Sequence, residues 1–370
     1  MTEIRAVTMP KWGLAMTEGK VAAWAVQEGE AVGPGTELVD IETSKITNAL
    51  EADTDGVLRR VCAAEGDTLP VGALLGVIAP ASMPDADIQA FIDGFVVEVD
   101  EDAGAEDAAA EPETVTVDGR TIRYLRMGQD GPAVLLIHGF GGDLNNWMFN
   151  QPALAERHAT YAIDLPGHGG SSKEVGDGSV EAMAAAVGGL MAALGLERAH
   201  LVGHSLGGAV ALALALGQPD RVASLTLVCS AGLGEEIAAD YVDGFIAASR
   251  RKDIKPVAQM LFADPSLVSR DMLEDILRYK RLDGVDAALR TIAGRVFADG
   301  RQAWSARARL DELAVPVQAV WGAQDRIVPP AHGDGLPERI GVRVIDGTGH
   351  MVHMEAAQEV NRLIEAIVAG

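Results

Sequence analysis

A serine flanked by glycines forms the chemically most specific motif of the chain. Residues 203–207 read GHSLG; they directly follow a predicted strand over 199–202 and open a predicted helix over 206–216. A sharp turn between a strand and a helix exposes a serine hydroxyl at the carboxyl edge of a sheet, where it can attack a carbonyl carbon. We therefore expect Ser205 to be a catalytic nucleophile.

An acid and a base for this serine follow later in the chain. Asp325 comes directly after a predicted strand over 315–321, and His350 follows a predicted strand over 342–345 in a glycine-rich turn. His350 would accept the serine proton, while Asp325 would fix the imidazole tautomer and stabilise the imidazolium. The order serine, acid, histidine places all three at one edge of a parallel sheet. His353 is the alternative base, but the glycine-bounded turn favours His350.

The negative charge that develops on the attacked carbonyl oxygen needs preorganised N–H donors. Residues 138–142 read HGFGG directly after a predicted buried strand over 133–137. In such a loop the backbone N–H of Phe140 can face that of Leu206, and the two form an oxyanion hole. Each donor of this kind lowers the barrier by about 3 kcal/mol.

Alternating strands and helices between residues 114 and 370 must position these groups. Short, wholly apolar strand patterns alternate there with helical patterns such as residues 181–194. This alternation predicts an α/β fold with a doubly wound, mostly parallel sheet. Residues 232–310 interrupt the alternation with charged, helical sequence, and we interpret them as a helical lid.

The first eighty residues contain an internal repeat. The pattern of glycines, acidic residues and aliphatic residues over 19–41 recurs at one constant offset over 56–78. Glycine turns between short alternating segments predict two interlocked small sheets, which make an all-β domain over residues 1–80. Residues 41–47 join the two halves as a hairpin, and Lys45 is expected at its tip.

Residues 81–113 connect the two predicted domains. Apolar residues recur at helical spacing over 88–95, and we expect this short helix to pack back on its own chain. Residues 98–113 are nearly all Ala, Gly, Asp and Glu. That composition cannot bury apolar surface and is typical of a solvated linker.

Composition restricts the possible functions. The 370 residues carry a net charge of −24, which disfavours binding to nucleic acids and to anionic membranes. The chain has neither a signal-like start nor an apolar run of about 20 residues, so we expect a cytoplasmic protein. Its two cysteines, Cys62 and Cys229, suit neither a disulfide framework nor a metal site. We expect both to be buried small hydrophobes and no metal to be bound.

The first domain resembles the lipoyl domains of 2-oxoacid dehydrogenase acyltransferases. The resemblance rests on residues 9–13 (MPKWG), on the repeat and on residues 42–45 (ETSK). It implies a flattened β-barrel in which a lipoylating enzyme attaches lipoic acid to Lys45. Biotin carriers share this fold but flank their lysine with methionines, whereas Ser44 and Ile46 stand here; lipoic acid is therefore favoured over biotin. The repeat places Lys45 at its midpoint, which argues against an unmodified, solvated lysine. In the lipoyl family the residue before the lysine is usually aspartate, and in this chain Ser44 takes that place.

The second domain resembles α/β-hydrolase-fold proteins, and the fusion resembles the acetyltransferase components of acetoin dehydrogenase complexes. Ordinary 2-oxoacid dehydrogenase acyltransferases instead carry a His-x-x-x-Asp-Gly motif, which this sequence lacks. The resemblance implies transfer of an acetyl group from S-acetyl-dihydrolipoyl-lysine to coenzyme A. It also implies two enzyme partners, a thiamine-diphosphate-dependent acetoin-cleaving component and a dihydrolipoamide dehydrogenase. We further expect a homo-oligomer.

Other functions use the same residues. A thioesterase or a C–C hydrolase would need the same triad but would release its acid product to water. A carrier-only scaffold would not need the triad at all. Within the transferase, Ser205 either forms an acyl-enzyme or assists direct attack by coenzyme A, and the sequence leaves both routes open.

Overall fold

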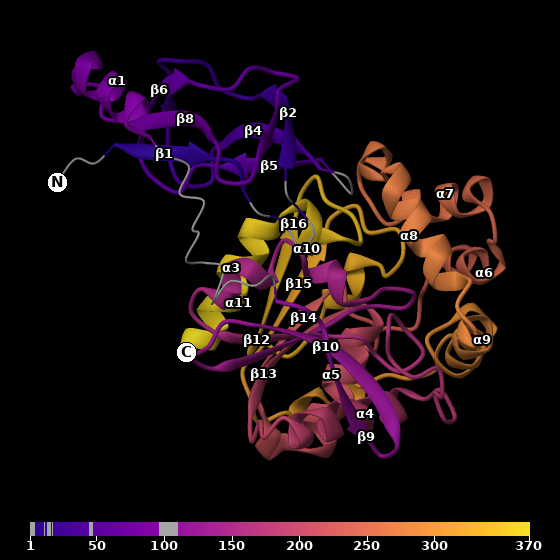
Figure 1. Ribbon diagram of the computed structural model, residues 1–370. Helices are drawn as coiled ribbons and strands as arrows, with labels where there is room; N and C mark the ends of the chain where they lie inside the picture. The colour runs from indigo at the N-terminus through magenta and orange to yellow at the C-terminus, as the bar shows by residue number, and fades with distance from the viewer. Residues whose placement is uncertain (1–3, 11, 13–15, 17, 44–46, 96–109) are drawn as a thin grey trace. The chain divides into compact units, whose positions relative to one another are not determined.

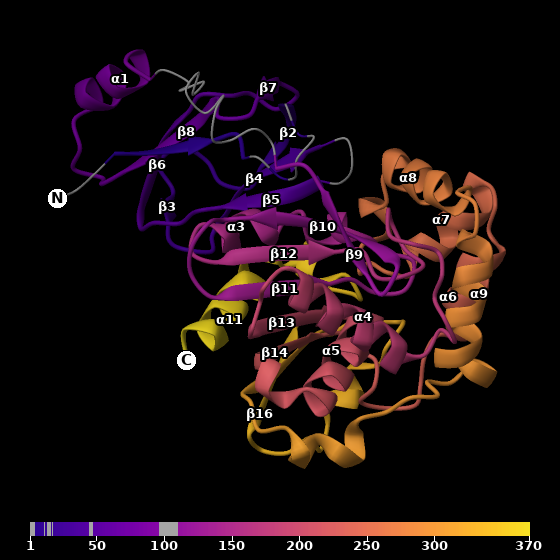
Figure 2. The same cartoon turned by 60° about the horizontal axis from the view of Figure 1, so that its bottom comes forward.

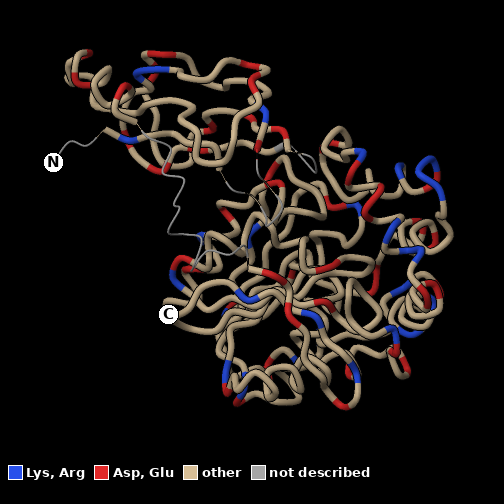
Figure 3. Tube along the Cα trace, viewed as in Figure 1, with Lys and Arg blue, Asp and Glu red and all other residues tan. Residues whose placement is uncertain are grey.

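A computed structural model describes the chain apart from residues 1–3, 11, 13–15, 17, 44–46 and 96–109 (Figure 1). Contacts between residues divide the chain into two compact units, residues 1–109 and residues 110–370. Acidic residues occur along the chain in both units (Figure 3), in keeping with the net charge of −24. Among the described helices, none is long and apolar enough to cross a membrane.

The first unit consists of two four-stranded sheets that enclose one core. One sheet has the strand order β1-β8-β6-β3 and the other β5-β4-β2-β7, so each sheet takes strands from both halves of the repeat. The strands are β1 (Arg5–Thr8), β2 (Glu18–Trp24), β3 (Ala31–Val32), β4 (Glu37–Glu42), β5 (Thr47–Glu51), β6 (Gly56–Val61), β7 (Thr68–Pro70) and β8 (Leu74–Ala79). The predicted interlocked all-β fold is confirmed.

The repeat is visible in the backbone conformation of corresponding glycines. Gly29 and Gly66 have φ angles of 92° and 94°, and Gly35 and Gly72 have φ angles of 85° and 84°. Only glycine adopts this left-handed conformation without steric cost. The same turns are therefore built twice, as the constant sequence offset predicts.

Helix α1 (Asp85–Asp93) packs on its own unit. The Ile88 side chain is fully buried in a small cluster with Val77 and Ala79 of β8. The Arg59 guanidinium of β6 donates hydrogen bonds to the carbonyl oxygens of residues 80, 81 and 83 and to the Asp85 carboxylate. The helical stripe expected in this segment thus faces its own chain.

The second unit is built on one eight-stranded sheet with the order β16-β15-β14-β13-β11-β12-β10-β9. Six strands from β16 to β12 are parallel, and β10 and β9 continue the sheet as antiparallel strands. The strands are β9 (Glu113–Val117), β10 (Arg120–Met127), β11 (Ala133–Ile137), β12 (Ala159–Ile163), β13 (Ala199–His204), β14 (Val222–Val228), β15 (Val317–Gly322) and β16 (Ile340–Ile345). The mostly parallel sheet predicted from the wholly apolar strands is confirmed.

Helices cover both faces of this sheet (Figures 1 and 2). Helices α4 (Val180–Ala193) and α5 (Leu206–Gly217) pack together on one face, and α3 (Gln151–Ala155) and α11 (Ala357–Ala369) pack together on the other. The short helix α10 (Val352–Glu355) precedes α11. Both faces are therefore buried, which accounts for the apolar strands.

Four further helices lie between β14 and β15 in the chain. They are α6 (Ala239–Ala247), α7 (Arg251–Gln259), α8 (Arg270–Lys280) and α9 (Val285–Val296). They fall within the segment that we interpret as a lid, and they group together beside the sheet (Figure 2). Of the two cysteines, Cys229 is buried as expected, whereas Cys62 is exposed, so that expectation was wrong for Cys62.

Replacing Ile88 by alanine tests the packing of α1. Loss of a fully buried isoleucine side chain should lower the free energy of unfolding of the first unit by about 2–5 kcal/mol. Urea unfolding of the full chain measures this loss, with hydrogen exchange of the β8 backbone amides as the probe of the first unit. Gln89→Ala on the exposed side of the helix is the control; equal stability of the two variants would contradict the packing role.

Candidate active site

Ser205 occupies a strained turn between β13 and α5. Its φ and ψ angles are 51° and −117°, a conformation that is unfavourable for a residue with a side chain. The Ser205 N–H donates to the Val228 carbonyl oxygen over 2.9 Å, which ties the turn to β14. A Cβ atom at Gly203 or at Gly207 would overlap backbone atoms of neighbouring segments. The glycines of the motif are therefore required by close backbone packing.

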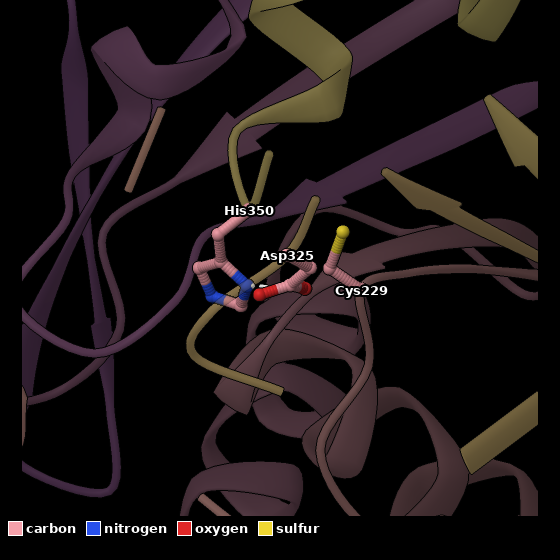
Figure 4. A group of neighbouring side chains, drawn as sticks. All are labelled: Cys229, Asp325 and His350. Atoms are coloured by element: carbon pink, nitrogen blue, oxygen red, sulfur yellow. Dashed lines mark hydrogen bonds and ion pairs between the residues drawn. The ribbon is translucent and has the colours of Figure 1, made fainter. Parts of the chain in front are cut away.

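Asp325 and His350 form a buried hydrogen-bonded pair (Figure 4). His350 Nδ1 lies 2.8 Å from Asp325 Oδ2, and the two side chains are 2% and 0% exposed. Asp325 Oδ1 accepts hydrogen bonds from the backbone N–H groups of Ile327 and Val328 at 2.8 and 3.0 Å. The carboxylate thus accepts a hydrogen bond from the Nδ1–H group of His350, which leaves Nε2 unprotonated and available to accept a proton.

His204 connects the serine turn to the His350 loop. Its Nε2 donates to the His350 carbonyl oxygen over 2.9 Å, and the centroids of the two rings are 4.6 Å apart. The structure therefore brings Ser205, the neighbour of His204, to the same edge of the sheet as the buried pair. Within the described residues the Ser205 hydroxyl and the His350 ring form no hydrogen bond; such contacts often align only when substrate binds.

The loop after β11 faces the serine turn. A Cβ atom at Gly139 would lie 2.9 Å from Ser205 Cβ, so this loop and the nucleophile are in direct contact. In the described part of the chain, neither the Phe140 N–H nor the Leu206 N–H donates to another protein atom. Both residues are buried. Two unpaired N–H groups beside a serine suit an oxyanion hole.

Asp164, which ends β12, has a structural role. Its carboxylate is fully buried, accepts hydrogen bonds from the N–H groups of Leu144 and Gly170, and lies 2.9 Å from Arg123 Nε. Burial raises the pKa of this carboxyl, and Arg123 opposes the rise. These contacts join strand β10 to the segments that follow β11 and β12, and none of them is to the Asp325–His350 pair.

Several other histidines around the site are buried and uncharged. Burial lowers the pKa of His353 to about 3, and it holds the pKa of His204 well below its ordinary value, aided by His353 and His350. His353 packs against Trp147 and His204 with ring centroids 4.6 and 4.5 Å apart. It therefore lies behind His204, and His350 is the histidine that contacts the acid.

Lys45 and its neighbours Ser44 and Ile46 lie outside the described residues. The flanking strands are described: β4 and β5 pair antiparallel, with Glu42 opposite Thr47. Four residues, 43–46, connect these paired ends. The connection thus includes the lysine, as the predicted hairpin requires.

Comparisons with known proteins agree with this two-unit structure. Residues 132–357 match the family model described as alpha/beta hydrolase fold, and residues 5–78 match the model described as biotin-requiring enzyme, which covers biotin and lipoyl carriers. A meta-cleavage product hydrolase from Pseudomonas fluorescens IP01 has a solved structure with a TM-score of 0.63. It is 24% identical, and the match covers 68% of this chain and 96% of that one. This likeness concerns the fold.

Two relatives match the chain over its whole length. The dihydrolipoyllysine-residue acetyltransferase component of the acetoin cleaving system of Cupriavidus necator is 47% identical over 364 residues, which are 98% of this chain and 97% of the relative. The component of the same name from Pseudomonas putida is 46% identical over 370 residues, which are 100% and 99% of the two chains. The chain belongs to this family of acetyltransferase components. The resemblance found in the sequence is confirmed, together with the two-part fold class.

One residue at the candidate active site was missed by sequence reasoning. Cys229 directly follows β14. Its sulfur, a carboxylate oxygen of Asp325 and a ring nitrogen of His350 all lie within 4.8 Å of one another (Figure 4). Its position directly after a buried strand, like that of Ser205, was the available signal.

The buried histidines predict acid sensitivity of the second unit. Their pKa values are lowered in the folded state, so the unfolded state takes up protons first as the pH falls below about 6.5. Each such histidine should reduce the free energy of unfolding by about 1.4 kcal/mol per pH unit between its unfolded and folded pKa values.

Urea unfolding at several pH values from 7.5 to 5 measures this slope. His353→Phe, which keeps an aromatic ring against Trp147, should make the slope shallower by the contribution of one histidine. A slope identical to that of the unsubstituted chain would contradict the burial of a neutral His353.

Proposed function

We propose that the chain transfers an acetyl group from the dihydrolipoyl arm on Lys45 to coenzyme A, with Ser205, His350 and Asp325 as the catalytic triad. The observation that carries the proposal is the buried Asp325–His350 pair at the same sheet edge as the strained Ser205. Full-length similarity to two acetyltransferase components supports the same reaction class.

Acetyl transfer begins with attack on the donor thioester. Ser205 Oγ forms a bond to the carbonyl carbon while His350 Nε2 takes the hydroxyl proton, and Asp325 stabilises the imidazolium. The Phe140 and Leu206 N–H groups hold the negative charge on the carbonyl oxygen. The C–S bond then breaks, and His350 returns the proton to the departing thiolate. The product of this half is acetyl-Ser205.

The second half repeats these steps with a different nucleophile. The thiol of coenzyme A gives its proton to His350 Nε2 and attacks the acetyl carbon, and the same two N–H groups hold the oxyanion. The C–O bond breaks, and His350 gives the proton to Ser205 Oγ. No electrons are exchanged, and free Ser205 is regenerated. The acyl-enzyme route predicts ping-pong kinetics.

The carrier role rests on the first unit. Lipoyl and biotinyl carriers are the class that residues 5–78 match, and β4 and β5 end on either side of the segment with Lys45. We propose lipoic acid on Lys45, attached by a lipoylating enzyme. An acetoin-cleaving thiamine-diphosphate enzyme would load the arm, and a dihydrolipoamide dehydrogenase would reoxidise it. Joining arm and triad in one chain raises the effective concentration of the donor.

The decisive experiment measures both products from S-acetyl-dihydrolipoamide and coenzyme A. Ser205→Ala should lower formation of acetyl-coenzyme A by on the order of 10⁴-fold, because the nucleophile is lost. Ser224→Ala removes a buried serine within β14 and should retain activity. Free acetate, followed in the same assay, detects the hydrolase alternative.

Each product pattern has one meaning. Acetyl-coenzyme A that requires Ser205 supports the transferase. Acetate as the sole product would make the chain a lipoyl-tethered hydrolase. Full activity of Ser205→Ala would exclude Ser205 as the nucleophile, and the carrier-only function predicts that this substitution leaves the activity of the whole complex unchanged.

A second prediction separates the carrier from the catalyst. Lys45→Arg keeps a positive charge but cannot form the lipoyl amide. This variant should lose the lipoyl mass increment and all transfer from a loaded arm, yet it should still use free S-acetyl-dihydrolipoamide at an unchanged rate. Mass spectrometry and the two assays check this; a lipoylated Lys45→Arg chain would place the attachment site elsewhere.

A further inference from the structure

Two neighbouring strands end in the same unusual way. Strands β13 and β14 are adjacent and parallel, and the residue directly after each has a positive φ angle, 51° at Ser205 and 43° at Cys229. The described chain contains only two other non-glycine residues of this kind, Asp118 and Asp299. Aspartate tolerates the left-handed region better than cysteine does. A cysteine in this conformation therefore indicates a use for its side chain.

The thiol of Cys229 reaches both loops of the catalytic pair. Its sulfur donates a weak hydrogen bond to the carbonyl oxygen of Gly349, directly before His350, over 3.9 Å. The sulfur also lies within 4.8 Å of a carboxylate oxygen of Asp325 and of a ring nitrogen of His350. The side chain is fully buried. Burial, and then the charge of Asp325, hold the pKa of this thiol well above its ordinary value. The thiol is thus a permanent donor and not a thiolate.

Asp325 is otherwise held from two directions. Its Oδ1 atom accepts from the backbone of its own loop, and its Oδ2 atom accepts from His350. Cys229 approaches from β14, and its own N–H donates to the Val320 carbonyl oxygen of β15 over 2.8 Å. The backbone of Cys229 is therefore fixed to the sheet, and its side chain lies beside the Asp325–His350 pair (Figure 4).

We infer that Cys229 is a positioning residue of the acetyl-transfer reaction: its thiol, hydrogen-bonded to the Gly349 carbonyl, holds the His350 loop against Asp325 in the geometry that activates Ser205. This inference rests on the proposed triad. It does not depend on whether the acetyl group passes to coenzyme A or to water, because it concerns only the activation of Ser205.

The alternative role for a buried cysteine is to fill space. Three substitutions separate the two roles. Cys229→Ser keeps a donor in place of the sulfur, Cys229→Ala removes the donor and keeps the strained backbone, and Cys229→Gly removes the donor and relieves the strain. Cys62→Ala, which removes the exposed thiol of the other unit, is the matched control.

The experiment uses the full chain and two readouts that need no acyl acceptor. The first is the rate at which a fluorophosphonate labels Ser205, and the second is the NMR resonance of the His350 Nδ1 proton. Cys229→Ala and Cys229→Gly should slow labelling by up to about tenfold, the effect of one lost hydrogen bond to a backbone carbonyl, and should shift the resonance. Cys229→Ser and Cys62→Ala should keep both near the unsubstituted values.

Thermal unfolding of the same variants completes the test. Cys229→Gly should unfold at a higher temperature than Cys229→Ala, because the strain is relieved, while its labelling stays slow. If alanine prevents folding, the glycine and serine variants still give the comparison. Unchanged labelling in Cys229→Gly, or equally slow labelling in Cys229→Ser, would overturn the inference. Failure of the proposed transfer would show separately, as acetate in place of acetyl-coenzyme A.

Discussion

The hydrogen bond between His350 Nδ1 and Asp325 Oδ2 is the interaction on which the catalytic unit depends. It lies in the protein interior, where an unpaired carboxylate or a misoriented imidazole would be costly. The parallel sheet makes the pair possible because strands β13, β14 and β15 all end at one edge, each followed by a residue of this group. Closely packed glycines, a strained serine and a strained cysteine at that edge are consequences of fitting these turns together.

Burial around the pair determines which groups can carry charge. His204 and His353 contact the site but are uncharged, because burial lowers the pKa of each. They contribute packing and one backbone hydrogen bond, which joins the serine turn to the His350 loop. Asp164 is equally buried, yet its contacts serve loops on the other side of β11. In the proposed mechanism, the charge that moves is thereby confined to His350 and the reacting oxygen and sulfur atoms.

Sequence reasoning succeeded where one local pattern determines the structure. The repeat predicted the two sheets of the first unit because each turn glycine has a fixed conformation, and apolar strands predicted the parallel sheet because both of its faces are buried. Ser205, Asp325 and His350 could be proposed because each follows a strand. The contact of Cys229 with Asp325 depends on a left-handed backbone angle and on the register between β14 and β15, which no local pattern encodes.

The choice between a thiol and water as acceptor cannot lie in the triad, since His350 can deprotonate either one. It must lie in the surroundings of the acetyl group. Phe140, whose N–H faces that group in the proposed mechanism, packs edge-on against Phe245 of α6 and against Phe297, which follows α9, with ring centroids 5.9 and 5.7 Å apart. The inserted helices thus surround the loop after β11 with aromatic surface. Such surface excludes water and strengthens hydrogen bonds to the oxyanion. In the proposed mechanism, selection of the acceptor would therefore fall to the inserted helices, and the sheet edge would supply the chemistry that transferases and hydrolases share.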